Sequence, residues 1–546
     1  MCGFYLHFSH NCPFNFINID DLRQGLYRRG PDNFDVKVNS NKKLLLAHSR
    51  LAIQDLSESA SQPMKLINSD YTLLFNGEVY NNHDLRKKYL TDIIFETDSD
   101  SETIIRLVDK YGIEESLSLI DGMISLVLFS EKENSIYFYR DSSGQKPLFY
   151  AFSEDKKSLA ISTNPSLIYK LSSSFKKKYD DSQLINYISC GFTEQSKTIY
   201  KGLFSSIPGL ISKINLDALN LEAKASIVNS SPISVKNFSN EEIHNKITES
   251  IISSLIGARS CGILLSGGID STAVAVATSK LKKIKRVYTL FYPYEDDNEY
   301  LQAKKTATEL NLEHIPIELN DESGVEVINN LYEIIDYPNP DPSIICSYLV
   351  AKEASKKDTI LLTGDGGDEI FGGYNRYKSL IKKFGYIFKF LPNNYKLIIL
   401  KSYLNNFSTN LGKIDINIDM VLKKIINENN SLLMSLCEID QNFYMVQHTL
   451  PKTDRAFMYF SIEGRAPLLN NFFKLNSKQF LKIEKRSTEK ILLRKYIEKN
   501  IGNVYSNSKK KGFSAHLDKL ANNRDFLYLL KEKITPLEYI FQEFST

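Results

Sequence analysis

Short apolar runs separated by turn residues dominate the chain through about residue 215. Runs of this kind, bounded by Gly, Pro, Asn, Asp and Ser, are typical of β-strands. We therefore expect strands at residues 43–47, 71–75, 123–129, 135–139 and 147–152. The pattern predicts a first half that is rich in antiparallel sheet.

The pattern changes from about residue 257, where short apolar runs are followed by stretches with helical spacing. Strands are expected at residues 262–265, 286–291 and 359–363. Alternation of strands and helices indicates a parallel α/β sheet. Beyond about residue 380 the chain is expected to be mostly helical.

The segment between the two patterns mixes Ser, Asn, Pro and charged residues in the manner of a linker. We therefore expect two domains of different fold class, residues 2–215 and 241–546, joined by a linker at 216–240.

The composition excludes some classes of partner but does not indicate a function. Hydrophobic residues at 42% and charged residues at 24% of 546 are ordinary for a folded chain, and the formal net charge of +3 is too small to indicate a nucleic-acid partner or a membrane surface. The six cysteines are scattered, with no pair at metal-ligand spacing, so reduced thiols are expected. No apolar segment approaches the roughly 20 residues that span a bilayer, and a cytoplasmic protein is expected.

The chain opens Met1-Cys2-Gly3, and a side chain as small as that of Cys2 normally permits removal of the initiator methionine. The thiol would then stand beside a free α-amine, which titrates near 8 and can act as its general base. The alternative is an ordinary buried cysteine near a terminus, and this short segment alone favours that alternative.

Five further segments favour Cys2 as a nucleophile over an ordinary buried cysteine. They are RRGPD (28–32), SRLAIQDL (49–56), QPM (62–64), FNGEVYN (75–81) and SDSE (99–102). They stand at the order and spacing found in class II glutamine amidotransferases. With Cys2 they resemble the glutaminase domain of that class, an α+β N-terminal nucleophile (Ntn) fold with antiparallel sheets. The resemblance implies that Cys2 attacks the amide of glutamine.

The same resemblance implies roles for the surrounding residues. Arg50 would pair with the carboxylate of glutamine, and Asp100 would hold its amine together with backbone around Gly77 and Glu78. The Asn76 side chain and the Gly77 N–H would form the oxyanion hole. The full implied glutamine-binding set is Arg50, Leu51, Ile53, Gln54, Asn76, Gly77, Glu78 and Asp100.

Each of these motifs has a structural alternative when it is taken alone. Asn76-Gly77 between apolar runs is a hairpin-turn signal. Ser99 and Glu102 also fit a helix capping box, in which Asp100 would merely favour the positive helix end. Arg50 alone would be a surface charge. Their joint occurrence with Cys2 favours the glutaminase interpretation.

In the second half, Ser266-Gly267-Gly268-Ile269-Asp270-Ser271 stands between an expected strand and an expected helix. Glycines there let backbone N–H groups form an anion nest at a helix N-terminus. The pattern lacks the Gly-Lys-Ser/Thr of a Walker A loop, which disfavours γ-phosphate transfer. It resembles the PP-loop of ATP pyrophosphatases, which cleave between the α and β phosphates, so adenylation of a carboxylate is implied.

A second acidic loop, residues 364–374, follows the expected strand 359–363. Asp270 and Asp368 are the expected Mg²⁺ ligands, because departing pyrophosphate needs a hard cation and few protein oxygens. Alone, such acidic loops would more often be solvated turns. The ATP contacts carried over from the resemblance are Leu264, Ser266, Gly267, Gly268, Asp270, Ser271, Leu290, Thr363 and Gly364.

Toward the C-terminus, residues 452–470, 489–496 and 509–513 resemble the remaining blocks of the asparagine synthetase domain. The resemblance then extends from Cys2 to about Leu517. It implies that Lys490 is catalytic and stabilises negative charge during adenylation and amide formation; without the family, an exposed helix lysine would be preferred.

The implied activity is that of a glutamine-hydrolysing asparagine synthetase. Ammonia released from glutamine would travel through an internal passage, ATP would adenylate the side-chain carboxylate of aspartate with loss of pyrophosphate, and asparagine, AMP and glutamate would form. Glutamine, ATP and aspartate are the expected partners, ATP and Mg²⁺ the cofactors. Homodimers are frequent in the family, so a homodimer is also expected.

Departures from the family pattern weaken the assignment of the acceptor carboxylate more than that of the reaction class. Asp365 stands where Glu is usual and is assigned to the acceptor pocket, while Asn470, Ser508 and His516 replace the usual Asp, Arg and Pro. These changes leave open a related amidotransferase acting on another carboxylate, such as a uronic acid in bacterial surface-polysaccharide synthesis.

Two further alternatives are less favoured. A relative that binds nucleotide without turnover is disfavoured because Cys2, Asp270, Asp368 and Lys490 are all present, and an enzyme that uses only free ammonia is disfavoured by Cys2.

Overall fold

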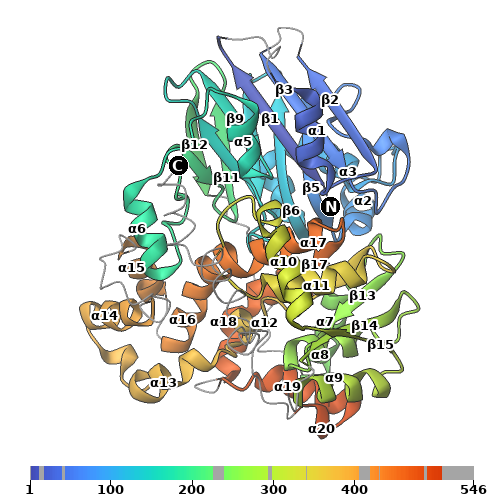
Figure 1. Cartoon of the computed structure of the whole chain (residues 1–546), viewed down its shortest axis with the longest axis vertical. Coiled ribbons are helices and arrows are strands. Elements are labelled where there is room, and N and C mark those ends of the chain that lie inside the picture. Colours follow the sequence, from blue (N-terminus) through green and yellow to red (C-terminus); the bar gives the residue numbers. More distant parts are fainter. Residues whose placement is uncertain are drawn as a thin grey trace.

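The computed structural model describes residues 2–11, 17–39, 43–225, 239–292, 298–339, 341–404, 419–428, 431–484 and 488–506. Two units stand one above the other in Figure 1, with the N-terminal sheets at the top and the C-terminal sheet and helices below. No helix of the described residues is long and apolar enough to cross a membrane.

The N-terminal unit contains two six-stranded sheets whose neighbouring strands are antiparallel. The first sheet has the order β10 (Leu203–Ser205), β8 (Phe149–Phe152), β9 (Ser158–Ser162), β1 (Gly3–Ser9), β3 (Leu44–Arg50) and β2 (Asn33–Val38). The second has the order β12 (Asn220–Ala225), β11 (Leu210–Asn215), β7 (Ser135–Arg140), β6 (Gly122–Ser130), β5 (Tyr71–Val79) and β4 (Met64–Lys65).

Alternating side chains stack these sheets into four layers. On β1, Phe4, Leu6 and Phe8 point into the apolar core between the sheets, whereas Tyr5 points to the opposite side. That outer face is covered by α1 (Ile19–Tyr27), α5 (Pro165–Leu171) and α6 (Asp181–Cys190). Helices α2 (Asn82–Tyr89), α3 (Asp100–Tyr111) and α4 (Ile113–Leu119) cover the outer face of the second sheet. The predicted α+β class with antiparallel sheets is confirmed.

The C-terminal unit is built on a five-stranded parallel sheet. Its order is β15 (Glu313–Glu318), β14 (Ile284–Phe291), β13 (Cys261–Leu264), β16 (Ile360–Leu362) and β17 (Glu463–Arg465). One face packs against α7 (Asn240–Ser253), α8 (Ile269–Thr278), α9 (Asn298–Glu309), α19 (Ile491–Ile501) and α20 (Asn503–Ser506). The other packs against α10 (Asp321–Ile334), α11 (Ile344–Ala354) and α17 (Leu450–Met458). The predicted parallel α/β sheet is confirmed.

Beyond residue 380 the described chain is mostly helical, as expected. Helices α13 (Asn375–Phe384), α14 (Asn393–Leu404), α15 (Asp419–Glu428) and α16 (Leu432–Asn442) form a separate apolar cluster, beside α12 (Gly367–Phe371) and α18 (Asn471–Glu484). The exception is β17, whose sequence Glu-Gly-Arg carries no strand signal. Its pairing with β16 fixes it, as Ile360 is opposite Glu463 and Leu362 opposite Arg465.

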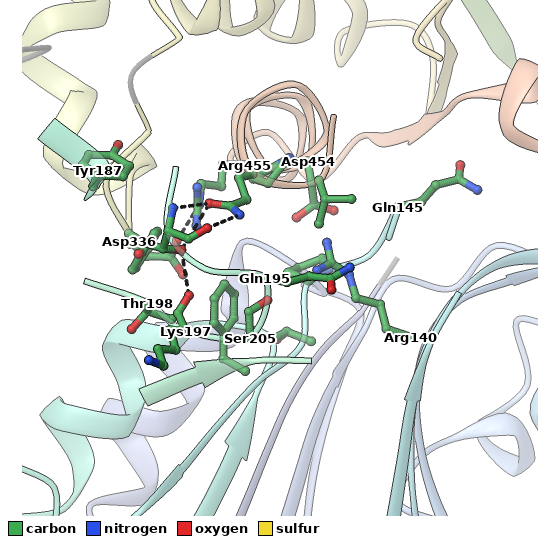
Figure 2. A pocket seen from close by; sticks show the side chains of 18 of the residues that line it. Arg140, Gln145, Tyr187, Gln195, Lys197, Thr198, Ser205, Asp336, Asp454 and Arg455 are labelled. Atoms are coloured by element: carbon green, nitrogen blue, oxygen red, sulfur yellow. Dashed lines mark hydrogen bonds and ion pairs between the residues drawn. The ribbon is translucent and has the colours of Figure 1, made fainter. Parts of the chain in front are cut away.

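The segment around α17 and β17 joins the two units. In Figure 1 these elements lie directly beneath the N-terminal sheets. Asn471 there donates from its backbone to Asp121 of the first unit (3.0 Å) and from its side chain to the carbonyl of Ile120 (3.1 Å). A cavity that is partly open to solvent lies between the units and is lined by residues of both (Figure 2).

Candidate active sites

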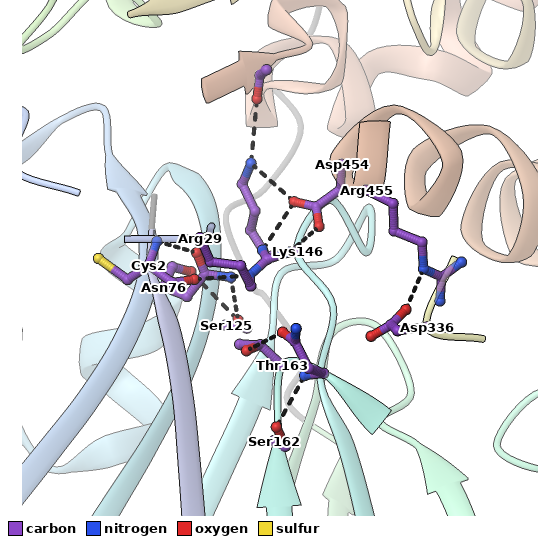
Figure 3. A network of polar contacts seen from close by, with 12 residues as sticks. Cys2, Arg29, Asn76, Ser125, Lys146, Ser162, Thr163, Asp336, Asp454 and Arg455 are labelled. Atoms are coloured by element: carbon purple, nitrogen blue, oxygen red, sulfur yellow. Dashed lines mark hydrogen bonds and ion pairs between the residues drawn. The ribbon is translucent and has the colours of Figure 1, made fainter. Parts of the chain in front are cut away.

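Cys2 lies at the junction of the two N-terminal sheets. It immediately precedes β1, is 8% exposed, and its backbone N–H donates to Oδ1 of Asn76 at 3.0 Å. Asn76 belongs to β5 of the other sheet, and its Nδ2 donates weakly to Ser125 at 3.4 Å (Figure 3). The structure thus brings together the predicted nucleophile and the predicted oxyanion donor.

Gly77 continues β5 and does not form a turn. It is opposite Ile124 of β6, and the strand runs on to Val79, so the hairpin alternative is wrong. Its φ is +153°, and a Cβ atom at this position would lie 2.0 Å from the carbonyl oxygen of Met123. Only glycine therefore fits beside Asn76 at this place in the sheet.

Burial raises the pKa of the Cys2 thiol, and the Leu51 N–H and the charge of Arg50 oppose this rise. Arg50 ends β3 and is 7% exposed, so the interpretation as a surface charge is wrong. Its guanidinium donates to the backbone carbonyls of Ser57, at 2.7 Å, and Asp55. These bonds close the loop that follows β3 and fix the guanidinium near the thiol.

Asp100 begins α3 and is buried beside the end of β5. Its carboxylate accepts a hydrogen bond from the Val79 N–H at 3.0 Å, and burial raises its pKa to about 6. Ser99 does cap this helix, but the Glu102 carboxylate accepts from Thr97 and Glu96 instead of the N-cap backbone. The capping-box alternative is therefore wrong for Glu102, while Asp100 bonds to β5.

The far wall of this site comes from the second unit. Arg465 of β17 is fully buried and lies 2.6 Å from Glu463 and 3.4 Å from Glu78. Burial raises the pKa of Glu78 well above its usual range, opposed by the charge of Arg465. Gln54 and Ile53 flank Glu78, where both pack near the Cβ position of Gly257. No sequence pattern indicated Arg465 as a neighbour of the predicted glutamine pocket.

Arg29 connects Cys2 to the second unit. Its Nε donates to the carbonyl of Cys2 at 3.1 Å, and its Nη1 and Nη2 donate to the two carboxylate oxygens of Asp454 at 2.7 and 3.2 Å (Figure 3). Both side chains are buried, at 7% and 4% exposure. Lys146 lies 4.0 Å from Asp454 and donates to the Gly464 carbonyl. We call the Arg29–Asp454 pair the interdomain clamp.

The predicted nucleotide loop lies between β13 and α8, as expected. Gly267 has φ +74°, and a Cβ there would lie 2.3 Å from the carbonyl oxygen of Glu299. The Ser266 and Ser271 hydroxyls lie 3.1 Å apart and Gly268 N–H donates to Ser266 Oγ. Gly364 packs against this loop, because its Cβ position is 2.9 Å from the Ser271 nitrogen.

The other residues assigned to ATP lie at the same edge of the sheet. Leu264 ends β13, Leu290 lies near the end of β14, and Thr363 directly follows β16. Because β13, β14 and β16 are parallel, their carboxyl ends meet at one edge.

Lys490 lies between the two predicted metal ligands. Its ammonium contacts the carboxylates of Asp270 and, at 2.7 Å, Asp368. Lys490 is 4% and Asp368 8% exposed, so neither the exposed-lysine nor the solvated-turn alternative holds. A Cβ on Gly373 would lie 1.9 Å from Cε of Lys490, so a larger residue there would displace the ammonium from the two carboxylates.

This donor set fits Mg²⁺. The ion usually takes one or two protein carboxylates and completes its shell with water and phosphate oxygens. Asp270 and Asp368 reach the same ammonium, so their carboxylates are close neighbours. Asp270 Oδ1 is buried and has no hydrogen-bond partner among the described residues.

Asp365, assigned to the acceptor pocket, follows β16 and faces α17. Its carboxylate accepts hydrogen bonds from Thr363 at 3.0 Å and Thr453 at 3.2 Å. Lys452 lies 3.6 Å from Asp341; burial lowers its pKa, but the charges of Asp341 and Asp365 outweigh this and hold it above the usual value. The carboxylate of Asp365 therefore acts on the ammonium of Lys452, a residue for which no sequence pattern indicated a role.

Of the departures from the family pattern, Asn470 is buried, and its side chain donates to the carbonyl of Ser250 and to Ser253. Ser508, His516 and the block at 509–513 lie outside the described residues.

Comparison with known proteins decides the family. Residues 1–224 match the glutamine amidotransferase domain model, and residues 242–539 match the asparagine synthase model. The chain belongs to the asparagine synthase family. It is therefore an ATP-dependent enzyme that uses glutamine to amidate a carboxylate, and the family resemblance read from the sequence is confirmed.

Curated relatives include asparagine synthetase [glutamine-hydrolyzing] 1 of Bacillus subtilis, which is 28% identical over 94% of this chain and 87% of that protein. A putative asparagine synthetase of Methanocaldococcus jannaschii is 27% identical over 65% of this chain and 72% of its own. The mouse asparagine synthetase is 27% identical over 68% of this chain and 67% of its own length.

The first prediction for this asparagine synthase family member concerns the interdomain clamp. Removing one partner of a buried ion pair costs on the order of 3 to 5 kcal/mol, because the other charge stays buried without a counter-ion. Asp454→Asn should therefore lower the free energy of unfolding by an amount of this order. It should also reduce glutamine-dependent turnover more than ammonia-dependent turnover, because Arg29 positions Cys2.

Glu333→Gln provides the matched control. Glu333 pairs with the neighbouring Arg28 across the same interface at 3.0 Å, but these side chains are 62% and 50% exposed. Its loss should cost less than about 1 kcal/mol in denaturant unfolding. Equal destabilisation by both substitutions would contradict the clamp.

The second prediction concerns pH and glutamine binding. The carboxyl pKa of Asp100 is raised from 3.8 to about 6, so the carboxylate becomes neutral as pH falls below that value. If it holds the α-ammonium of glutamine, KM for glutamine should rise by up to about tenfold per pH unit below about 6. Asp100→Asn should give a high KM without this pH dependence; a flat wild-type profile across the acidic range would disprove the assignment.

Proposed function

We propose that this enzyme is a glutamine-hydrolysing asparagine synthetase whose acceptor is aspartate. The observation that carries the proposal is the effect of the Asp365 charge on the buried ammonium of Lys452, which also lies 3.6 Å from Asp341, beside the nucleotide loop. An α-amino acid carries an ammonium and a carboxylate, and this pocket offers one group of each opposite charge. A uronic acid has no ammonium to meet Asp365, so the alternative acceptor fits the pocket less well.

In the glutaminase half, Cys2 Sγ attacks the carboxamide carbon and forms a thioester while ammonia leaves; water then releases glutamate. Once the initiator methionine is removed, the nitrogen held by Asn76 Oδ1 is the α-amine, which takes the thiol proton. Asn76 Nδ2 and the Gly77 N–H are the proposed oxyanion donors. The long Nδ2 contact to Ser125 is weak enough for an oxyanion to replace it.

Arg50 and Asp100 are the proposed partners of the carboxylate and the ammonium of glutamine, with Leu51, Ile53, Gln54 and Glu78 around them. Both charged groups are buried and fixed by backbone contacts, which leaves little orientational freedom. A pocket held in this way binds its substrate without first ordering side chains.

In the synthetase half, the N–H groups of Ser266–Ser271 are proposed to hold the phosphates of ATP, with Leu264, Leu290, Thr363 and Gly364 around the nucleoside. Asp270 and Asp368 would hold Mg²⁺, which neutralises the departing pyrophosphate. The acceptor carboxylate attacks the α-phosphorus, pyrophosphate leaves, and ammonia then displaces AMP to form the amide. Lys490 supplies a positive charge for the oxygens that become more negative in both steps.

The domain boundaries at 2–215, 216–240 and 241–546, the cytoplasmic location, the homodimer and the ammonia passage stay predictions from the sequence.

The third prediction tests the nucleophile. Cys2→Ala should abolish glutamine-dependent amide formation and keep the ammonia-dependent reaction near the wild-type rate, because the synthetase site is untouched. Cys437→Ala is the matched control, since Cys437 is a buried free cysteine of the helical cluster, and it should retain both activities. Retention of glutamine-dependent activity by Cys2→Ala would remove Cys2 from the mechanism.

The fourth prediction tests the acceptor. Purified enzyme with glutamine, ATP and Mg²⁺ should form AMP, pyrophosphate and asparagine when aspartate is present, and none of these products with galacturonate. Asp365→Asn should raise KM for aspartate at least about tenfold, as expected for loss of a charge-assisted hydrogen bond, and leave KM for glutamine unchanged. Turnover with galacturonate but not with aspartate would replace this proposal by its alternative.

A further inference from the structure

The interdomain cavity has a set of polar groups that neither half-reaction uses. Figure 2 shows residues of both units around it, among them Arg140 at the end of β7 and Arg455 on α17. Both arginines are buried, at 3% and 8% exposure. A buried guanidinium is expected to satisfy its N–H groups, because each buried donor without an acceptor is costly.

Both guanidinium groups have a nitrogen without an acceptor. Arg140 donates from Nη2 to the Gly144 carbonyl, and Arg455 donates from Nε to Asp336 at 2.6 Å. Arg140 Nε and Arg455 Nη1 are buried and have no partner among the described residues. Two buried donors without a partner thus belong to cavity-lining residues of separate units.

Ion pairs neutralise most of the charged side chains around the cavity. Arg29 pairs with Asp454, Arg455 with Asp336, and Lys197 at the rim with Glu194. Arg140 forms no ion pair within the described part of the chain. Burial lowers the pKa of Arg140 to about 10; the charges of Asp141 and Asp454 oppose this fall, and the charge of Arg455 adds to it.

We propose that this cavity binds a small carboxylate through the unsatisfied N–H groups of Arg140 and Arg455. A carboxylate has two acceptor oxygens, one for each of these donors, whereas a dianionic phosphate would place more negative charge beside Asp336 and Asp454. The side chains of Phe149, Tyr187 and Tyr337 supply apolar surface for a carbon skeleton. The ligand would lie against the interdomain clamp, because Arg29 and Asp454 also line the cavity.

This site is separate from the proposed function. It does not involve Arg50, Lys452 or the nucleotide loop. The proposal does not depend on which carboxylate the enzyme amidates.

Calorimetric titration of the full chain with acetate and with benzoate, at constant chloride, tests the proposal. Arg140→Gln should weaken one carboxylate site at least about tenfold, because a charge-assisted hydrogen bond is lost. Lys197→Gln is the control, since Lys197 lines the rim and is already paired with Glu194; it should change the affinity less than about twofold. Carboxylates bound at Arg50 or Lys452 would be unaffected by Arg140→Gln, so the loss identifies the cavity.

A second measurement uses the unmodified enzyme and does not depend on the stability of a variant. Crystals of the wild type soaked in 4-bromobenzoate should show anomalous bromine density in the cavity, with the carboxylate against Arg140. Equal affinity of wild type and Arg140→Gln, or soaked crystals with only water in the cavity, would overturn the proposal.

Discussion

The buried pairing of Arg29 with Asp454 is the contact on which both halves of the enzyme depend. Unpaired, either charge would cost several kcal/mol in the low-dielectric interior, so the two units are held where these side chains meet. The same guanidinium donates to the carbonyl of Cys2, so the proposed nucleophile is positioned by a helix of the other unit. The packing between the two units therefore also determines the geometry around Cys2.

Three consecutive residues of α17 contact three neighbouring sites. On α17, Thr453 donates to Asp365 in the proposed acceptor pocket, Asp454 accepts from Arg29, and Arg455 donates to Asp336 at the cavity. Successive residues of an α-helix point about 100° apart, so three consecutive side chains can reach three directions. A shift of α17 would therefore move side chains at the proposed acceptor pocket, at Cys2 and in the cavity together.

Local sequence predicted the elements well where the pattern was strong. The five strands expected in the first half overlap β3, β5, β6, β7 and β8, although the first and last begin one and two residues too early, because alternating or apolar runs reflect burial directly. Asn76-Gly77 shows the limit of such signals, because a turn dipeptide here continues a central strand beside Met123. Strand β17 has no apolar run at all, and its hydrogen bonds to β16 alone make it a strand.

The sequence by itself determined the class of chemistry: an N-terminal cysteine with its glutaminase motifs, a PP-loop and a second acidic loop, all recognisable as short patterns of neighbouring residues. Only the tertiary structure decided which charges meet. Arg29 finds Asp454, Arg465 finds Glu78, and Lys490 joins Asp270 to Asp368 across separations of hundreds of residues. The reason is physical, because a buried charge is stable only beside its counter-charge, and chain folding, not local spacing, brings those partners together.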